Sequence, residues 1–303
     1  MKKVPDKPVS KVIRNPSKAY TWIRNRIIEE RIVTPLRARY LFDFDWDVAV
    51  ILDACRYDLA ASQGTEHPIN LGEPGKAYSA ASNSADWIRR TFGRASADEL
   101  QNTAYITGNL YTNRLPDTPL AHLDRVWKYA WDDDKGCVPP RPITDRAIAA
   151  ARDEVGEKYI VHYMQPHLPP ISDNPPYEPK RTDPSQGSGA NEQSAWDRVK
   201  HGEIEEEAVR EGYNNNLSPV LDEVSLLLEN IEAFKIVITA DHGNYLGKNG
   251  CWGHPSFEMA SPVRHVPWWE TSASDEQTHS PAEYDRATGT PSRDDQLKAL
   301  GYK

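Results

Sequence analysis

The feature that most constrains this chain is a set of short apolar runs that end abruptly in residues capable of chemistry. The run Ile236–Thr239 is apolar and β-branched, and it leads within two residues into Asp241 and His242. The run Val48–Leu52 is continuously apolar and ends at Asp53. Such runs are typical of strands buried on both faces, which occur mainly in parallel sheets covered by helices. The two runs therefore predict an α/β fold.

Further strands and helices alternate along the rest of the chain. The predicted strands are residues 104–107, 126–131 and 159–164, and the predicted helices are residues 144–155, 203–233 and 293–303. Thr144 is the expected N-cap of the first of these helices, and Gly156 is expected to close it. This alternation predicts a three-layer α/β/α sandwich with a mostly parallel central sheet. No internal repeat or linker is evident, so one domain covering residues 1–303 is expected.

Two segments lie outside this alternation. Residues 17–40 have helical periodicity and predict an amphipathic helix broken at Pro35. The apolar positions of this helix are Ile23, Ile27, Ile28 and Ile32. A helix that packs on the body or covers a site is favoured over one that lies on a membrane surface. Residues 171–200 are rich in Pro, Ser, Gly, Asp and Asn, which predicts a long loop-rich insert.

Composition excludes several classes of partner. The net charge is −9, so neither a nucleic acid nor an anionic membrane surface is expected to attract the chain as a whole. The three cysteines form no CxxC motif, which argues against a disulfide framework and a thiolate zinc site. The basic N-terminus lacks an apolar signal region, and no run is long enough to span a membrane. A cytoplasmic location without a stable membrane anchor is therefore expected, and the oligomeric state stays open.

Candidate metal ligands gather where the predicted strands end. The carboxyl ends of parallel strands meet at one edge of a sheet, and ligands bind there. The residues expected at this edge are Asp53, His162, His167, Asp241, His242 and His254. Carboxylate and imidazole groups are donors that divalent metals prefer. Burial of an ionised Asp241 without a partner would cost several kcal/mol or force the carboxylate to become neutral. A bound cation would remove that penalty. His162 could equally be a strand residue that faces a neighbour.

The motifs at these strand ends resemble those of a known superfamily. The segments "VAVILDACRYD", "VHYMQPHLPP", "ITADHGNYLG" and "WGHP", in this order, are similar to the alkaline phosphatase superfamily, in particular its sulfatase-like branch. The resemblance covers residues 46–303 and implies the alkaline-phosphatase-like fold. It also implies a divalent metal, Mn²⁺, Mg²⁺, Ca²⁺ or Zn²⁺, held by Asp53, Asp241 and His242. One metal site is favoured, and a second ion at His167 and His254 is possible.

The resemblance further implies a nucleophile at the start of a helix downstream of Asp53. Ser84 immediately precedes a run with helical periodicity. A hydroxyl at a helix N-terminus lies in the positive end of the helix dipole, and a bound metal lowers its pKa. Ser82 is the alternative nucleophile, and both serines could instead merely cap the helix. Cys55 is a rival, but "CRYDL" lacks the Pro and the Arg of the C/S-x-P-x-R motif that sulfatases convert to formylglycine.

The chain is therefore predicted to be a metal-dependent hydrolase of a phosphate or sulfate ester carried by a small molecule or a glycan. Ser84 would attack phosphorus or sulfur in line, and His167 or His254 would contact the oxygens or protonate the leaving group. Arg56 and His162 are predicted to contact the substrate.

Two alternatives remain open. One is a non-catalytic metal- or anion-binding protein of the same fold, because Asn244 replaces the Glu that often follows the ADHG motif and the formylglycine motif is absent. The other is a transferase of phosphoryl-type groups in surface-glycan metabolism. For Arg56 the alternative to substrate contact is an ion pair with Asp58.

Overall fold

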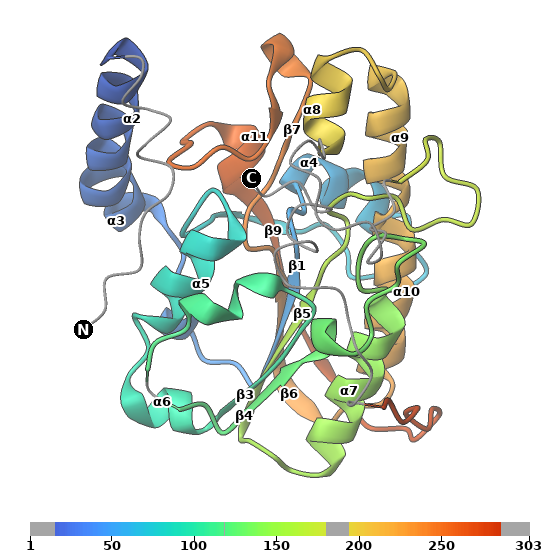
Figure 1. Cartoon of the computed structure of the whole chain (residues 1–303). Coiled ribbons are helices and arrows are strands. Elements are labelled where there is room, and N and C mark those ends of the chain that lie inside the picture. Colours follow the sequence, from blue (N-terminus) through green and yellow to red (C-terminus); the bar gives the residue numbers. More distant parts are fainter. Residues whose placement is uncertain (1–15, 118, 180–193, 286–303) are drawn as a thin grey trace.

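The computed structural model describes residues 16–117, 119–179 and 194–285, and these build a seven-stranded central sheet (Figure 1). Its strands are β1 (Val48–Leu52), β2 (Gly75–Tyr78), β3 (Thr103–Thr107), β4 (His122–Arg125), β5 (Lys158–Tyr163), β6 (Ala233–Thr239) and β9 (His265–Ala273). Their order is β2-β9-β6-β1-β5-β3-β4. Strands β6, β1, β5, β3 and β4 run parallel, and β9 is antiparallel to both of its neighbours. The predicted mostly parallel sheet is confirmed.

The middle strand β1 explains why its sequence is apolar without interruption. All five of its residues are buried, because β5 and β6 pair with its two edges and helices cover its faces. The register places Ile51 opposite both His162 and Thr239. The carboxyl ends of these three strands are therefore level, and the polar residues that follow them meet at one edge of the sheet.

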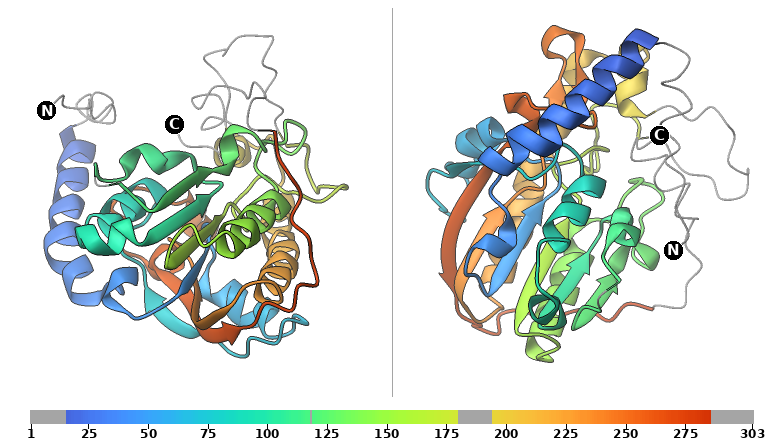
Figure 2. Two further views of the ribbon diagram at one scale, coloured as in Figure 1. Left: turned by 90° about the horizontal axis from the view of Figure 1, so that it is seen from below. Right: turned by 90° about the vertical axis from the view of Figure 1, so that its left-hand side faces the viewer.

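Helices cover both faces of the sheet (Figure 2). The larger helices of the described part are α2 (Pro16–Ile28), which lies at one side of the molecule, α5 (Ser84–Phe92), α7 (Pro140–Arg152), α9 (Glu206–Asn215) and α10 (Leu217–Leu228). Neighbouring residues of β5 identify the two faces. The His162 ring contacts Trp87 of α5, whereas the Tyr163 hydroxyl bonds Thr144 of α7 at 2.9 Å. The predicted three-layer arrangement is thus confirmed.

Short elements complete the described part. The short helices are α3 (Thr34–Arg37), α4 (Tyr57–Leu59), α6 (Ala97–Gln101), α8 (Ala195–Lys200) and α11 (Ser261–Arg264). A small antiparallel pair is formed by β7 (Tyr245–Leu246) and β8 (Trp252–Gly253). No helix in residues 16–117, 119–179 and 194–285 is long and apolar enough to cross a membrane. Nothing in the fold supports the cytoplasmic location expected from the sequence.

Several predicted boundaries are wrong. Helix α7 begins at Pro140 rather than after Thr144, because proline fits the first turn of a helix, where no N–H is needed. It ends at Arg152, before Gly156. Residues 126–131 begin with a 3-10 turn instead of forming a strand. The strand is β4, just upstream, whose polar edge residues hid it from a search for apolar runs.

The predicted helix 203–233 is divided into α9 and α10 around Asn216. The predicted loop 171–200 is partly helical, because Ser194 caps α8 by accepting a hydrogen bond from the Asp197 amide. Residues 180–193 of this loop and the predicted helix 293–303 lie outside the described residues. The single domain of residues 1–303 stays a prediction.

The N-terminal segment differs most from its prediction. Helix α2 passes through a π-helical turn at Glu29–Val33 into α3, so the backbone stays helical past Pro35. Pro35 occupies the first turn of α3, where its missing N–H is tolerated. The segment packs on the body, as expected, but not through its apolar face, because Ile23 and Ile27 are each 51% exposed. The side of this segment that faces the body carries the buried Glu29 instead.

Candidate active site

The first strand end fixes one carboxylate. Asp53 follows β1 and is fully buried. Its Oδ2 accepts a hydrogen bond from Asn109 Nδ2 at 2.9 Å and another from Ser84 Oγ at 3.3 Å. Its Oδ1 has no hydrogen-bond partner among the described residues. A buried carboxylate oxygen in this state is available to coordinate a metal ion or to accept a hydrogen bond from a ligand.

Ala54 ties the ends of β1 and β6 together. Its φ of 61° lies in the left-handed region, which is strained for a residue with a Cβ. In this conformation the Ala54 N–H donates to Asp241 Oδ1 at 3.0 Å, and its carbonyl accepts from the Tyr213 hydroxyl at 2.7 Å. Hydrogen bonds with Asp241 and Tyr213 therefore hold Ala54 in this strained conformation.

The third strand end brings in the other two predicted metal ligands. The His242 N–H donates to Asp241 Oδ1 at 2.8 Å, while Asp241 Oδ2 has no hydrogen-bond partner within the described part. His242 Nδ1 lies 2.8 Å from the Gly243 carbonyl, which can only accept, so Nδ1 is the protonated nitrogen of the neutral ring and Nε2 of that tautomer has the lone pair. Nε2 lies 3.6 Å from Asp53 Oδ1 and 3.5 Å from Asp241 Oδ2. The structure thus brings Asp53, Asp241 and His242 together.

Gly243 makes the turn after His242 possible. A Cβ at this position would lie 2.3 Å from the Pro262 carbonyl oxygen, so no other residue fits without movement of the backbone. The Gly243 N–H donates to the Val263 carbonyl at 2.7 Å. The missing side chain therefore allows the backbone of this turn to approach Pro262 closely.

Ser84 is the first residue of α5 and lies inside the cluster. The N-cap is Asn83, whose side chain accepts from the Asp86 amide at 2.9 Å, so the capping alternative does not apply to Ser84. The Ser84 Oγ lies 3.2 Å from His242 Nε2. Ser82 Oγ instead donates to the Pro255 carbonyl at 2.8 Å. Of the two serines, Ser84 is the one placed against the predicted ligands.

The two buried cysteines are poor nucleophiles. Cys55 and Cys137 are buried and Cys251 is exposed. Burial raises the pKa of the Cys55 thiol far above its usual value, and the carboxylates of Asp58 and Asp241 raise it further. A thiol that stays protonated is unreactive. Cys55 is a small buried residue, as the missing formylglycine motif suggested.

His162 lies among the metal candidates rather than apart from them. Its Nδ1 is 2.8 Å from the Tyr105 hydroxyl, and its Nε2 is 3.8 Å from Asp241 Oδ2. Donor atoms of Asp53, His162 and Asp241 lie within 4.8 Å of one another. His162 Nε2 has no hydrogen-bond partner among the described residues. His162 is therefore a fourth possible ligand, and the substrate contact expected from the sequence stays a prediction.

His167 and His254 form a second layer beside His242. Their Nε2 atoms are 3.1 Å apart, and the His254 ring lies 4.4 Å from the His242 ring, centroid to centroid. Burial lowers the pKa of His167 to about 4, and burial with the neighbouring histidines lowers the pKa of His254 well below its usual value. Both imidazoles are therefore neutral at pH 7.

Asn216 holds the turn that carries His167. Its side-chain amide donates to the carbonyls of His167 at 3.1 Å and Pro169 at 2.9 Å, and its oxygen accepts from the Ile171 amide at 3.0 Å. Neither Asn216 nor Tyr213 carried a sequence signal, because Tyr213 lies in a helix of ordinary periodicity and Asn216 lies at the junction that follows that helix. Asn109 did carry one, since it follows the predicted strand 104–107 at the same edge of the sheet.

Arg56 is engaged by a neighbour. Its Nε donates to Asp58 Oδ1 at 2.7 Å, a second nitrogen pairs with Asp58 Oδ2, and its Nη1 donates to the Asn244 carbonyl at 3.2 Å. The ion pair with Asp58 is the alternative that the sequence left open, and contact with an anionic substrate stays a prediction. Both amide atoms of the buried Asn244 side chain lack a hydrogen-bond partner among the described residues.

The site has an excess of buried negative charge. Burial and the neighbouring Asp241 raise the pKa of Asp53 well above its usual value. Burial would also raise the pKa of Asp241, but His242 and His162 outweigh it and lower that pKa. Burial lowers the pKa of His162 to about 4, so it adds little positive charge. Two adjacent carboxylates can both ionise in such a place when a cation lies between them.

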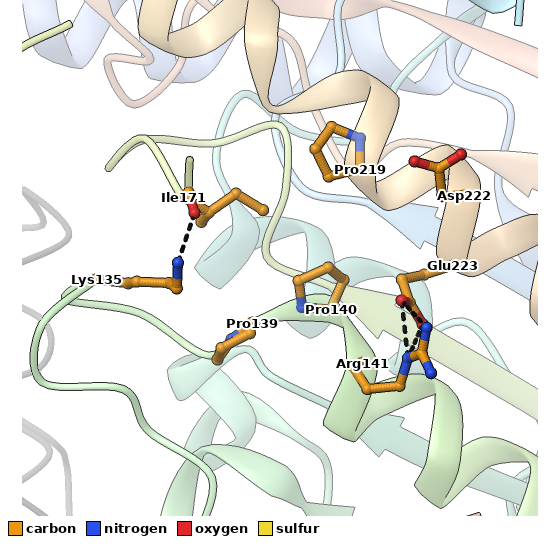
Figure 3. A pocket seen from close by; sticks show the side chains of 8 residues that line it. All are labelled: Lys135, Pro139, Pro140, Arg141, Ile171, Pro219, Asp222 and Glu223. Carbon is orange, nitrogen blue, oxygen red and sulfur yellow. Dashed lines mark hydrogen bonds and ion pairs between the residues drawn. The ribbon is translucent and has the colours of Figure 1, made fainter. Parts of the chain in front are cut away.

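A separate hollow of about 390 Å³ lies between α7 and α10 (Figure 3). Its charged side chains are already paired: Arg141 with Glu223 at 2.8 Å, and Lys135 Nζ with the Ile171 carbonyl at 2.8 Å. None of the site residues above lines it. The hollow is therefore not part of the candidate site.

No protein-family model matches the chain, and no curated protein matches it. Solved structures do. The soluble domain of lipooligosaccharide phosphoethanolamine transferase A from Neisseria meningitidis is 15% identical over 74% of this chain and 75% of that one, with a TM-score of 0.44. BT1596, a 2-O GAG sulfatase, is 12% identical over 78% and 64%, with a TM-score of 0.47.

A protein in the alkaline phosphatase superfamily from Vibrio parahaemolyticus is 11% identical over 75% of this chain and 60% of that one, with a TM-score of 0.43. The chain is thus similar to a phosphoethanolamine transferase domain, a sulfatase and an alkaline phosphatase superfamily protein.

Proposed function

We propose that the chain cleaves a phosphate or sulfate ester through a covalent intermediate on Ser84, with the help of a divalent metal. The observation that supports this most is the position of the Ser84 hydroxyl, 3.3 Å from Asp53 Oδ2 and 3.2 Å from His242 Nε2. A serine at a helix N-terminus, surrounded by buried acceptors, is placed for nucleophilic attack. The hydroxyl of a serine that only capped a helix would bond a backbone amide instead.

The residues present fit a metal. Asp53 Oδ1, Asp241 Oδ2 and His162 Nε2 are buried polar atoms without a hydrogen-bond partner among the described residues, and His242 Nε2 presents a lone pair beside them. Asp53, Asp241 and His242 would hold the ion, with His162 as a further ligand. Mixed oxygen and nitrogen donors favour Mn²⁺ or Zn²⁺ over Mg²⁺ or Ca²⁺. When bound, the ion would lower the pKa of the Ser84 hydroxyl and offset charge on the transferring group.

The chain's own residues account for the rest of the reaction. Ser84 Oγ forms a bond to phosphorus or sulfur while the ester oxygen leaves, and the serine proton passes to a neighbouring acceptor such as Asp53. The positive end of the α5 dipole, at Ser84, stabilises the negative oxygens of the transferring group. The leaving oxygen takes up a proton from solvent. A water then attacks the transferred group and releases a proton to solvent, the bond to Ser84 Oγ breaks, and Oγ takes its proton back from Asp53.

His167 and His254 contact the oxygens of the transferring group in this proposal. Because both imidazoles are neutral at pH 7, hydrogen bonding fits them better than proton donation to the leaving group. A second ion would use the Nε2 atoms of the same two residues. Metal content per chain separates these roles, since one bound ion leaves the pair to the substrate and two do not.

Transfer to an alcohol instead of water is the second candidate, because the same serine-bound intermediate serves both reactions. A screen of aryl phosphates, aryl sulfates and phosphodiesters, each with and without an added alcohol acceptor, tests the proposal. Release of the aryl alcohol supports ester cleavage, and a product that contains the acceptor identifies transfer. If metal binds and no ester of any kind is turned over, the chain is a binding protein and the proposal is wrong.

Removal of the metal is expected to abolish turnover. Dialysis against a chelator should reduce activity to background, and addition of Mn²⁺ or Zn²⁺ should restore it, with elemental analysis as the measurement. The ion should also raise the melting temperature, because a ligand that binds only the folded state stabilises it. Full activity without metal would contradict the proposal and favour His242 as a general base for Ser84.

Replacement of Asn109 is expected to weaken metal binding. Its amide fixes Asp53 Oδ2, and loss of a residue that orients a ligand typically costs about 10- to 100-fold in metal affinity. The measurement is metal titration of Asn109→Ala by calorimetry. Asn102→Ala is the matched control, because Asn102 is exposed and lies at the end of α6, away from the cluster. Equal affinities for both variants would contradict this role.

A further inference from the structure

The N-terminal helical segment, residues 16–37, carries its apolar side chains on the outside. Of the seven large apolar side chains that are exposed in the described part of the chain, five lie here. They are Tyr20, Ile23, Ile27, Ile32 and Leu36, which are 51% to 80% exposed. A concentration of this kind on a short segment marks an interaction surface rather than scattered exposure. We call these five residues the outer apolar face.

The same side of the segment is basic. Among the side chains of residue 20 and residues 22–37, which the structure describes, the other exposed ones are Arg24, Arg31, Pro35 and Arg37, and none of them is acidic. Arg24 and Arg31 form no ion pair with any described residue. The exposed side of this segment is therefore apolar and positively charged, although the whole chain has a net charge of −9.

Both acids of the segment are turned away from this side. Glu29 is buried and pairs with Arg90 of α5 and with the buried Arg264, each at 2.6 Å. Glu30 pairs with Arg26 at 3.3 Å and lies close to Arg89. The polar side of the segment thus faces the protein, which is the reverse of an ordinary surface helix.

The segment is firmly attached, so the exposure of its isoleucines is not the result of loose packing. Arg264 also donates to Thr34 Oγ1 at 2.8 Å, and the Trp22 ring packs edge-on against Phe257 at 5.2 Å between centroids. The attachment uses ion pairs and aromatic contacts and leaves the outer apolar face to another occupant.

We propose that the outer apolar face and its arginines bind the surface of an anionic lipid bilayer. Helices that lie in a membrane interface combine large apolar residues with arginine or lysine, and they gain affinity from both burial and attraction to anionic lipids. The adjoining residues 1–15 have a basic composition, with four Lys, one Arg and one Asp. The charge of this surface is therefore complementary to that of an anionic membrane.

A second copy of the chain fits this surface less well. In a two-fold dimer the same patch would contact itself, and Arg24 and Arg31 would oppose like charges without an acid nearby.

Figure 1 places α2 at the end of the sheet where α4 follows β1, which is the end where the strands deliver Asp53 and Asp241. Lipid binding through this segment would bring that end of the protein toward the membrane. The contact would be peripheral and reversible, so the expectation of no stable anchor is unaffected.

Vesicle flotation of the full chain tests the proposal. Binding is expected to vesicles of phosphatidylcholine with phosphatidylglycerol, not to phosphatidylcholine alone, and it should weaken as salt is raised. The double variant Arg24→Gln/Arg31→Gln should bind about thirtyfold more weakly, at roughly tenfold per 1.4 kcal/mol and about 1 kcal/mol for each cation near the surface. The triple variant Ile23→Gln/Ile27→Gln/Ile32→Gln should lose binding.

Matched controls come from elsewhere on the surface. Phe234→Gln removes a side chain that is 84% exposed, and Arg114→Gln removes an exposed cation, both outside the segment. Both controls should bind as the unmodified chain does. All substituted side chains are exposed, so melting temperatures should stay within a few degrees of the parent.

Three results would overturn the proposal. The first is no flotation of the parent chain with anionic vesicles. The second is flotation that the triple variant retains. The third is a dimer, seen by sedimentation, that the triple variant loses while vesicle binding is absent, since that result assigns the outer apolar face to a second copy.

Discussion

Replacement of Ser84 by alanine is expected to lower kcat for ester cleavage by at least about a thousandfold, since loss of a nucleophile of this kind removes most of the chemical rate. Among the serines that the structure describes, Ser84 is the one whose hydroxyl bonds both Asp53 and His242. The measurement is kcat and KM of the metal-loaded protein, with elemental analysis to show that the ion is retained.

Ser82→Ala is the matched control for this variant. Ser82 lies two residues away and its hydroxyl bonds the Pro255 carbonyl and the Glu258 amide, outside the cluster. Its removal should leave kcat within a few fold of the parent and lower the stability only slightly. If Ser82→Ala loses activity and Ser84→Ala keeps it, Ser84 is not the nucleophile. Trapping of a phosphorylated peptide, identified by mass, would then locate the residue that is.

Replacement of Glu29 by alanine is expected to destabilise the fold by about 3–5 kcal/mol, the penalty for leaving a buried charge without its partner. Glu29 is 1% exposed and pairs with Arg264, which is fully buried, and with Arg90. Its loss leaves two guanidinium groups without their common carboxylate. Urea unfolding followed by circular dichroism measures the change in the free energy of unfolding.

Glu30→Ala is the control, because Glu30 is partly exposed and its pairs with Arg26 and Arg89 involve exposed side chains. A change of roughly 0–1 kcal/mol is expected there. If both variants lose the same stability, the buried network is not what holds the segment.

The pH dependence of stability provides an independent test of the ion pairs that Glu29 forms. Burial alone would raise the pKa of Glu29, but Arg90 and Arg264 outweigh it and lower that pKa. A lowered carboxyl pKa means that the stabilisation is fully present above the unfolded value of about 4.3 and disappears as pH falls through the folded value. The stability difference between the parent and Glu29→Gln should therefore shrink on acidification below about pH 4.

The central sheet and the meeting of its strand ends could be predicted from the sequence because both follow from local patterns. Val48–Leu52 is apolar throughout since β1 lies in the middle of the sheet, and Asp53 and Asp241 follow strands that must end at one edge. Strand β2 was missed. The first two residues of this short strand are exposed, so its sequence contains no continuous apolar run.

Helical periodicity identified the segment 17–40 but not which of its sides faces the protein. The side that faces the protein depends on Arg264, which lies 235 residues from Glu29 along the chain and pairs with it in the interior. The same limit applies to Asn216 and Tyr213. Both hold backbone turns at the site through contacts that only the folded chain brings about. Patterns within a short window carry no information about such distant partners.

The accessibility of the cysteines has a practical value for studying this protein. Cys55 and Cys137 are enclosed, while Cys251 is exposed and lies three residues before His254. A thiol-reactive fluorophore would therefore attach at a defined position, three residues along the chain from His254, without any engineering of the chain. Such a label would serve as an optical reporter for the entry of ions and small anions.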